Sequence, residues 1–193
     1  MDSNSKQNKG MKKKLLNITA AALSIGALFA VNALAADELA TRAQQTIANF
    51  QSADSNLKSF MANSAGYAVF PSIGKGGLVV GGARGSGLLY VNGAIAGRTT
   101  MTQGSIGAQA GGQTFSQIIV FQSPTAVSNF KDGKFQLGAD VNAVALSTSV
   151  SKSVPLSYTR GVAVFTMAQS GLMVQAAVSG QRFTFEPLMP TGR

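Results

Sequence analysis

The chain has 193 residues and a formal net charge of +9, with 22 glycines, 5 prolines and neither cysteine nor histidine. This size and composition fit one small globular domain. Without His or Cys, the chain lacks an imidazole base, a thiol nucleophile and any nitrogen or sulfur ligand for zinc, and it forms no disulfides. We therefore expect a protein that is not an enzyme, with no catalytic residues, no cofactor and no metal site.

The first 35 residues have the pattern of a secretory signal peptide. Lys12 to Lys14 precede an apolar run from Leu15 to Val31, and Ala33-Leu34-Ala35 supplies a small-x-small cleavage pattern. A permanent membrane anchor is the alternative, but polar residues interrupt the run and it is short for a membrane span. We predict cleavage after Ala35 and a periplasmic protein. Met11 would serve as well as Met1 for the start of translation.

The mature chain, residues 36–193, stays basic. Removing the signal peptide takes away five lysines and one aspartate, which leaves 11 basic and 6 acidic residues. Outside the cytoplasm, the commonest anionic partner is a membrane or an envelope polymer rather than nucleic acid. The alternative is that scattered basic residues only keep the surface soluble.

Residues 36–64 form the one clearly helical segment, because they contain no Gly or Pro and their apolar residues recur at helical spacing. Ser52-Ala53-Asp54 is expected to break the segment into two helices. One interpretation is an amphipathic helix lying on a membrane. Packing on a sheet is favoured, because Asp37, Glu38 and Asp54 dilute the basic face that membrane-surface helices carry.

Residues 66–90 alternate apolar, strand-forming runs with glycines that are too frequent for a helix. The predicted elements are, in order, a strand from Tyr67 to Phe70 that ends at Pro71, a turn at Ser72 to Gly76, a strand at Leu78 to Val80, a bend at Gly85 to Gly87 and a strand at Leu88 to Val91. Asn92-Gly93 then predicts a type I′ hairpin turn.

The rest of the chain is predicted to be mostly β, with one short helix. Ser116 to Phe121 has the pattern of a central strand, and a helix follows with Ser123 as N-cap and Pro124 in its first position. Val127 and Phe130 are expected to face inward. Further elements are Phe135 to Leu146 as one strand or a bent pair, a loop at Ser147 to Tyr158, and strands at Val162 to Met167, Leu172 to Val178 and Arg182 to Phe185.

Two stretches of the chain resemble each other. Gly161 to Phe165 repeats the pattern of Gly66 to Phe70, and Gly171 to Val174 repeats that of Gly77 to Val80. We infer two related hairpins that face each other in one β structure. The predicted fold is α+β: a strongly bent, mostly antiparallel sheet, barrel- or sandwich-like, with the N-terminal helices packed on it. Glycine-rich short strands need such bends, and closure would remove exposed edges.

The glycine clusters also suggest a binding site. Neither cluster is a phosphate cradle of known type, because Gly74 to Gly77 lacks the ending of a P-loop and Gly82 to Gly87 lies between strands. Lys75, Arg84 and Arg98 stand among these glycines, whose exposed amides would assist anion binding. The alternative is that the glycines only shape tight turns.

Several motifs resemble the SYLF domain, also called the actin-regulator or DUF500 family. They are AGYAVFP at Ala65, KGGLVVGG at Lys75, GSGLLY at Gly85, SIGAQAGGQ at Ser105, FQLGADVN at Phe135 and VFTMAQSGLM at Val164. The resemblance covers about Leu39 to Glu186 and implies a lipid-binding domain. Eukaryotic members bind phosphoinositides, partly through a basic N-terminal helix, and some bind actin filaments. Here that helical segment offers Arg42 and Lys58, and an exported protein would not meet actin.

The leading hypothesis is a non-enzymatic envelope protein that associates with anionic phospholipid head groups through Lys75, Arg84, Arg98, Lys58 and Arg42. The alternative is a structural or protein-interaction module of the periplasm without lipid binding. A carboxylate pair of Asp140 and Glu186 would be the only route to an enzyme. The sequence fixes neither the lipid nor the oligomeric state.

Overall fold

The computed structural model describes residues 37–76, 80–106, 113–137, 143–146, 156–168 and 180–188. The predicted signal peptide lies outside these residues, and the described residues from 39 onward belong to one compact unit. After a helix over residues 37–53, the elements are α2 (Asn56–Ala62), β1 (Gly66–Gly76), β2 (Val80–Val91), β3 (Ala94–Ile106), β4 (Gln113–Phe121), α3 (Pro124–Lys131), β5 (Ala143–Leu146), β6 (Val162–Ala168) and β7 (Gln181–Pro187).

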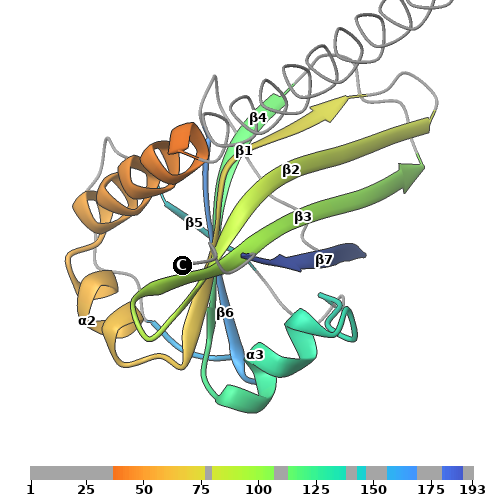
Figure 1. Cartoon of the computed structure of the whole chain (residues 1–193). Helices are drawn as coiled ribbons and strands as arrows, with labels where there is room; N and C mark the ends of the chain where they lie inside the picture. The colour runs from red at the N-terminus through yellow and green to blue at the C-terminus, as the bar shows by residue number, and fades with distance from the viewer. Residues whose placement is uncertain are drawn as a thin grey trace, which may run out of the picture. The chain divides into compact units, whose positions relative to one another are not determined.

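The strands form one sheet in the order β5-β6-β4-β1-β2-β3-β7 (Figure 1). All neighbouring strands are antiparallel except β5 and β6, which are parallel. The α+β class and the mostly antiparallel sheet are thus confirmed. The expected barrel closure is wrong, because the described strands end at β5 on one edge and β7 on the other.

The sheet nevertheless bends strongly, so that its edge strand β7 packs against its centre. The ring centroids of Phe183 in β7 and Phe70 in β1 lie 5.7 Å apart, although two strands separate β7 from β1. On the concave side, Phe130 of α3 lies 5.1 Å from Phe183, measured between ring centroids. This apolar cluster, which also includes Phe121 and Phe135, is the first of two cores.

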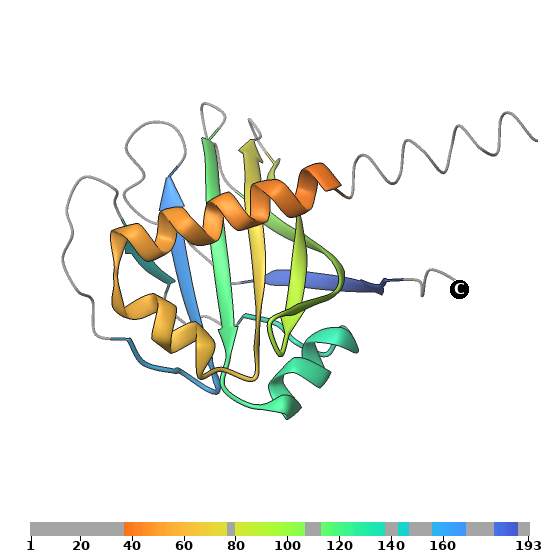
Figure 2. The same cartoon turned by 60° about the vertical axis from the view of Figure 1, so that its left-hand side comes forward.

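The second core lies on the opposite face of the sheet, beneath the N-terminal helices. Ala43, Phe50 and Leu57 are fully buried, and they pack in one cluster with Ile118 of β4 and Phe165 of β6. Figure 2 shows the 37–53 helix crossing in front of these strands. The apolar helix face is thus buried on the sheet, as predicted. The predicted break is also confirmed, since Asp54 Oδ1 accepts a hydrogen bond of 2.9 Å from the Asn56 amide.

Two predicted interruptions of the strands are wrong. Strand β1 continues through Pro71 to Gly76, because the pairing register shifts on both sides of this proline and a bulge accommodates its missing amide. The predicted turn at Ser72 to Gly76 is therefore part of β1. Similarly, β2 passes through Gly85 to Gly87 without a break.

The first halves of the two repeat copies lie on either side of one strand. The two copies begin β1 and β6, which pair with β4 from opposite sides: Ile119 lies opposite Ala68 on one side and Val164 on the other. The repeated strands thus flank a shared partner, whereas residues 77–79 and 171–174, from the second halves of the two copies, lie outside the described residues. The predicted strand at Leu172 to Val178 lies outside the described residues.

Local signals at the turns and the short helix are confirmed. Asn92 and Gly93 have φ values of 52° and 77°, the left-handed pair that a type I′ turn requires, and they join β2 to β3. The Ser123 hydroxyl accepts a hydrogen bond of 3.2 Å from the Ala126 amide, and Val127 and Phe130 are buried.

A buried pair of amides ties β4 to β7 inside the bend. Gln117 and Gln181 are both fully buried, and each side-chain amide donates to the other, at 2.9 Å and 3.1 Å.

Replacing Gln117 by leucine should lower the free energy of unfolding by about 1–3 kcal/mol, because the Gln181 amide would stay buried without its partner. The Gln117→Leu, Gln181→Leu variant should recover most of this loss. Urea denaturation of both variants tests this. A double variant with a lower free energy of unfolding than the single variant would contradict it.

Candidate functional site

The outer face of β2, β3 and β7 carries rows of polar side chains that the strand register places side by side. Residues that pair across neighbouring strands point to the same face of a sheet. The first row is Arg84, Thr102 and Arg182, the second is Ser86, Thr100 and Thr184, and the third is Leu88, Arg98 and Glu186. We call these three rows the polar face.

The alternation of burial along each strand confirms that these rows point outward. In β7, Gln181 and Phe183 are buried, whereas Arg182 and Thr184 between and after them are exposed. In β2, Arg84 is exposed beside the buried Ala83. Leu88 is buried with the second core. The polar face is thus a continuation of the sheet surface that the N-terminal helices cover elsewhere.

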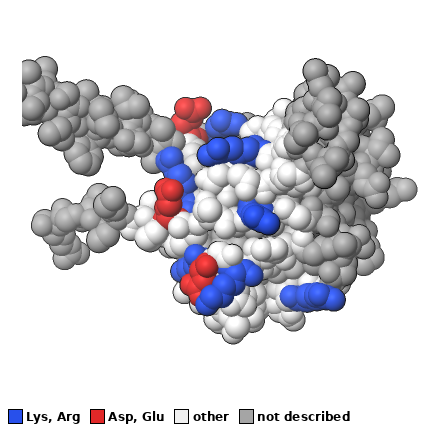
Figure 3. All heavy atoms as spheres, turned by 90° about the vertical axis from the view of Figure 1, so that its right-hand side faces the viewer, with Lys and Arg blue, Asp and Glu red and all other residues white. Residues whose placement is uncertain are grey.

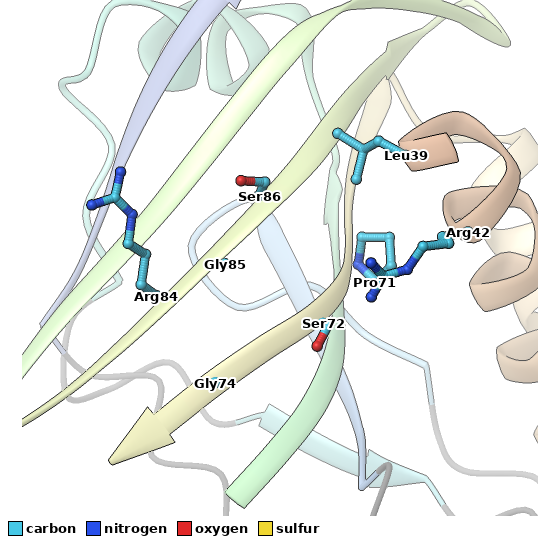
Figure 4. Close-up of a pocket in the computed structure, with 8 residues that line it drawn as sticks. All are labelled: Leu39, Arg42, Pro71, Ser72, Gly74, Arg84, Gly85 and Ser86. Atoms are coloured by element: carbon cyan, nitrogen blue, oxygen red, sulfur yellow. The ribbon is translucent and has the colours of Figure 1, made fainter. Parts of the chain in front are cut away.

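A pocket of about 420 Å³ lies where the 37–53 helix meets this surface. Its lining is Leu39, Arg42, Pro71, Ser72, Gly74, Arg84, Gly85 and Ser86. In Figure 4, Arg42 extends from the helix toward Pro71, whereas the Arg84 guanidinium points away from Arg42. The two arginines therefore share the pocket wall but offer their charges in different directions.

The structure brings some of the predicted site residues together and leaves others apart. Arg42 and Arg84 line one pocket, and Arg98 lies further along the polar face. Lys75 pairs with Ala83 in the β1–β2 ladder, next to the pair of Gly74 and Arg84. The predicted turn at Ser72 to Gly76 would have put Lys75 outside a strand, but Lys75 lies within β1.

Lys58 lies at another site. It lines a pocket of about 460 Å³ together with Tyr67 and the Asn92-Gly93 turn. Burial raises the pKa of Tyr67 above its ordinary value of 10.0, so this phenol stays neutral at physiological pH. The pocket thus has the Lys58 cation beside a neutral, partly apolar wall. Its lining includes no residue of the polar face.

Arg182 is the residue that sequence reasoning missed. The alternation in QRFTFEP, with Phe183 and Phe185 between polar residues, is enough to put Arg182, Thr184 and Glu186 on one face of a strand. What the sequence could not supply was the neighbour of that strand. Pairing of β7 with β3 brings Arg182 into the row of Arg84.

The charge of this side of the molecule is mainly positive. Figure 3 shows separate Lys and Arg groups on a largely uncharged surface, with fewer Asp and Glu. Within the polar face, Glu186 is the acidic member of the described rows, and it pairs with Arg98 in the β3–β7 ladder. The first two rows carry no acidic side chain.

Groups of three or more potential metal ligands are not found among the described residues. In the same part of the chain, no helix combines the length and the hydropathy that crossing a membrane requires.

Comparison with known families connects part of this fold to a named domain. The family model described as Ysc84, Las17-binding protein actin regulator, matches residues 102–187. The match runs from within β3 through β7, so it contains Thr102 and Arg182 but not Arg42, Lys58, Lys75, Arg84 or Arg98. A search of curated proteins gave no match. The matched segment is just under half of the chain, and its similarity to this family model supports the resemblance to the SYLF domain seen in the sequence.

Proposed function

We propose that this protein associates with anionic phospholipid head groups at the periplasmic side of the cell envelope and catalyses no reaction. The observation that carries the proposal is the polar face, where Arg84, Arg98 and Arg182 stand outward with Glu186 as the acidic residue of the described rows. The basic composition of the mature chain and the predicted signal peptide support it, as does the lipid binding that the SYLF resemblance implies.

The physical basis is attraction between basic side chains and a negative surface. Each Lys or Arg near an anionic membrane contributes about 1 kcal/mol, and the contribution falls off within a Debye length. Three arginines would therefore supply about 3 kcal/mol, or a hundredfold preference for anionic over neutral vesicles. The preference should shrink as the ionic strength rises.

Sedimentation of the mature protein with vesicles tests the proposal. Vesicles that contain phosphatidylglycerol should bind it at low salt and release it at high salt, whereas phosphatidylcholine vesicles should not bind it. Equal binding to both, or binding indifferent to salt, would overturn the electrostatic account. No binding under any condition, together with a defined partner recovered by crosslinking, would support the protein-interaction alternative. Phosphoinositide vesicles form a third arm, because the family resemblance implies that lipid for eukaryotic members.

Charge reversal at two arginines tests where the membrane is bound. The Arg84→Glu, Arg98→Glu variant should bind anionic vesicles at least about thirtyfold more weakly, since the two lost cations contribute roughly 2 kcal/mol and the membrane repels the two new carboxylates. Folding should survive, because exposed charges contribute little to stability. Lys134→Glu is the matched control, since Lys134 is 71% exposed in an ion pair with Asp132 and lies outside the polar face. Because the control reverses one charge and the double variant reverses two, a loss in binding free energy for Lys134→Glu half as large as that of the double variant would mean that net charge, and not this face, determines binding.

A further inference from the structure

We infer that Arg84 and Arg182 together hold one phosphate group of a membrane lipid, above Thr102. The inference rests on the proposed function and adds a discrete site to it. Nothing in the sequence patterns assigns Arg182 such a role. The alternative is a diffuse attraction, in which each arginine adds to the surface potential and none contacts a particular phosphate.

The strand register gives the geometry of this site. Thr102 of β3 lies opposite Arg84 of β2 on one side and Arg182 of β7 on the other. Neighbouring strands lie about 4.8 Å apart, so the two arginines rise from the same face about 10 Å from each other. Figure 4 shows the Arg84 guanidinium directed away from the Arg42 side of the pocket. Both long side chains can therefore reach one group held over the Thr102 hydroxyl.

The charges in and around the row favour an anion at this position. Arg84 and Arg182 are both exposed, and the first two rows of the polar face contain no carboxylate that would offset their mutual repulsion. Arg98 differs, because Glu186 lies directly opposite it in the next strand. Of the three arginines on this face, Arg84 and Arg182 are thus the two whose ladder partners leave their charge uncompensated.

Space and hydrogen-bonding groups surround the same row. On one side lies the pair of Gly82 and Gly104, which has no side chains, and a Cβ built at Gly104 would meet nothing within 4 Å. On the other side lies the row of Ser86, Thr100 and Thr184, whose hydroxyls both donate and accept hydrogen bonds. A head group can therefore approach over the glycines while its remaining oxygens meet hydroxyls.

Phosphate suits this arrangement better than a generic negative charge does. A guanidinium presents parallel N–H donors in a planar fork that matches two phosphate oxygens, whereas a lysine ammonium acts as a point charge. Exchange of arginine for lysine therefore separates the two accounts. It keeps the surface potential, on which diffuse attraction depends, and removes the fork, on which a phosphate site depends.

The experiment compares Arg84→Lys and Arg182→Lys with the matched control Arg160→Lys, using phosphatidylglycerol vesicles. Arg160 is an exposed arginine in a turn outside the polar face. Each of the first two should weaken binding about tenfold, since a charge-assisted hydrogen bond lost at a fixed total charge has about that effect. Arg160→Lys should change binding less than about twofold. Thermal unfolding of all three should match that of the parent protein, which keeps the comparison free of folding defects.

The outcomes separate this inference from the proposed function. If the parent protein binds anionic vesicles and the three lysine variants bind equally well, the phosphate site is overturned while the electrostatic association stands. If the parent protein does not bind vesicles, the association itself fails. Inorganic phosphate is then titrated while the Thr102 amide is followed by NMR. A shift that Arg182→Lys abolishes would replace the lipid assignment by a free-phosphate site, and no shift would remove the site altogether.

Discussion

Replacing Phe183 by alanine should lower the free energy of unfolding by about 3–5 kcal/mol. Phe183 is 4% exposed, and its ring lies 5.7 Å from Phe70 and 5.1 Å from Phe130, measured between centroids. Its ring joins the edge strand β7 to both the centre of the sheet and α3, in addition to the Gln117–Gln181 bonds. Alanine would leave a cavity with rigid walls on three sides, because strands β1 and β7 cannot both move inward without breaking their ladders.

Urea denaturation followed by circular dichroism measures this loss. The loss is a large part of the 5–15 kcal/mol that stabilises a typical domain, so the variant should be partly unfolded near physiological temperature. Leu188→Ala is the control, because Leu188 follows β7 directly and is 54% exposed. A loss below about 1 kcal/mol for Phe183→Ala would mean that β7 does not pack into the first core as described.

Replacing Gly87 by alanine is expected to be nearly as damaging, through overpacking instead of a cavity. A Cβ at this position of β2 would collide with the Val69 carbonyl oxygen, and it would lie 2.7 Å from Cδ1 of Phe70. Because the carbonyl belongs to the neighbouring strand, relief requires a shift of the backbone beside the bulge of β1. We expect a loss of about 3 kcal/mol in the free energy of unfolding, at the upper end for overpacked cores.

Gly104→Ala is the matched control for this substitution. Gly104 also lies in a strand, but nothing lies within 4 Å of a Cβ built there. Its replacement should leave stability unchanged or raise it slightly, because alanine restricts the unfolded chain more than glycine does. If the two alanine variants were equally stable, the close approach of β1 and β2 at Gly87 would be wrong.

The local structure of this chain could largely be predicted from its sequence. Helical periodicity identified the two N-terminal helices. Asn92-Gly93 identified the hairpin turn, and Ser123-Pro124 identified the start of α3. These signals are short-range, because each depends on residues within one or two turns of the chain.

Errors arose where a distant strand overrides a local preference. Pro71 and Gly85 to Gly87 have the pattern of interruptions, yet both lie inside strands. Pairing with β2 and β4 on both sides of the bulge keeps β1 continuous past the proline, and the glycines of β2 are needed where the neighbouring strand approaches closely. A short stretch of sequence does not show which strands lie beside it. The neighbours of β1 and β2 became known only from the order of the strands in the sheet.

The candidate site shows the same limit. Composition and glycine context identified Arg84 and Arg98, which do lie on the polar face. Arg42, which lines the pocket beside it, came from the helical segment that the family resemblance points to. Arg182 stayed hidden because its significance comes from the β3–β7 pairing. Lys58 was grouped with these residues only through the family resemblance, and it lies in another pocket.

The sheet order also determines when this chain can complete its fold. Strands β1 to β3 form a meander of neighbours in sequence, but the strands that complete the sheet, β5 and β6 on one side and β7 on the other, come from the last third of the chain. The hydroxyl of Thr99 finds its acceptor, the carbonyl of Thr184, 85 positions away. Such non-local pairing makes folding slow, in the range of milliseconds to seconds, because long loops must close before their contacts form. During synthesis, β4 would therefore present an unpaired edge until β6 has been made, and β3 would present one until the chain up to Pro187 has been made.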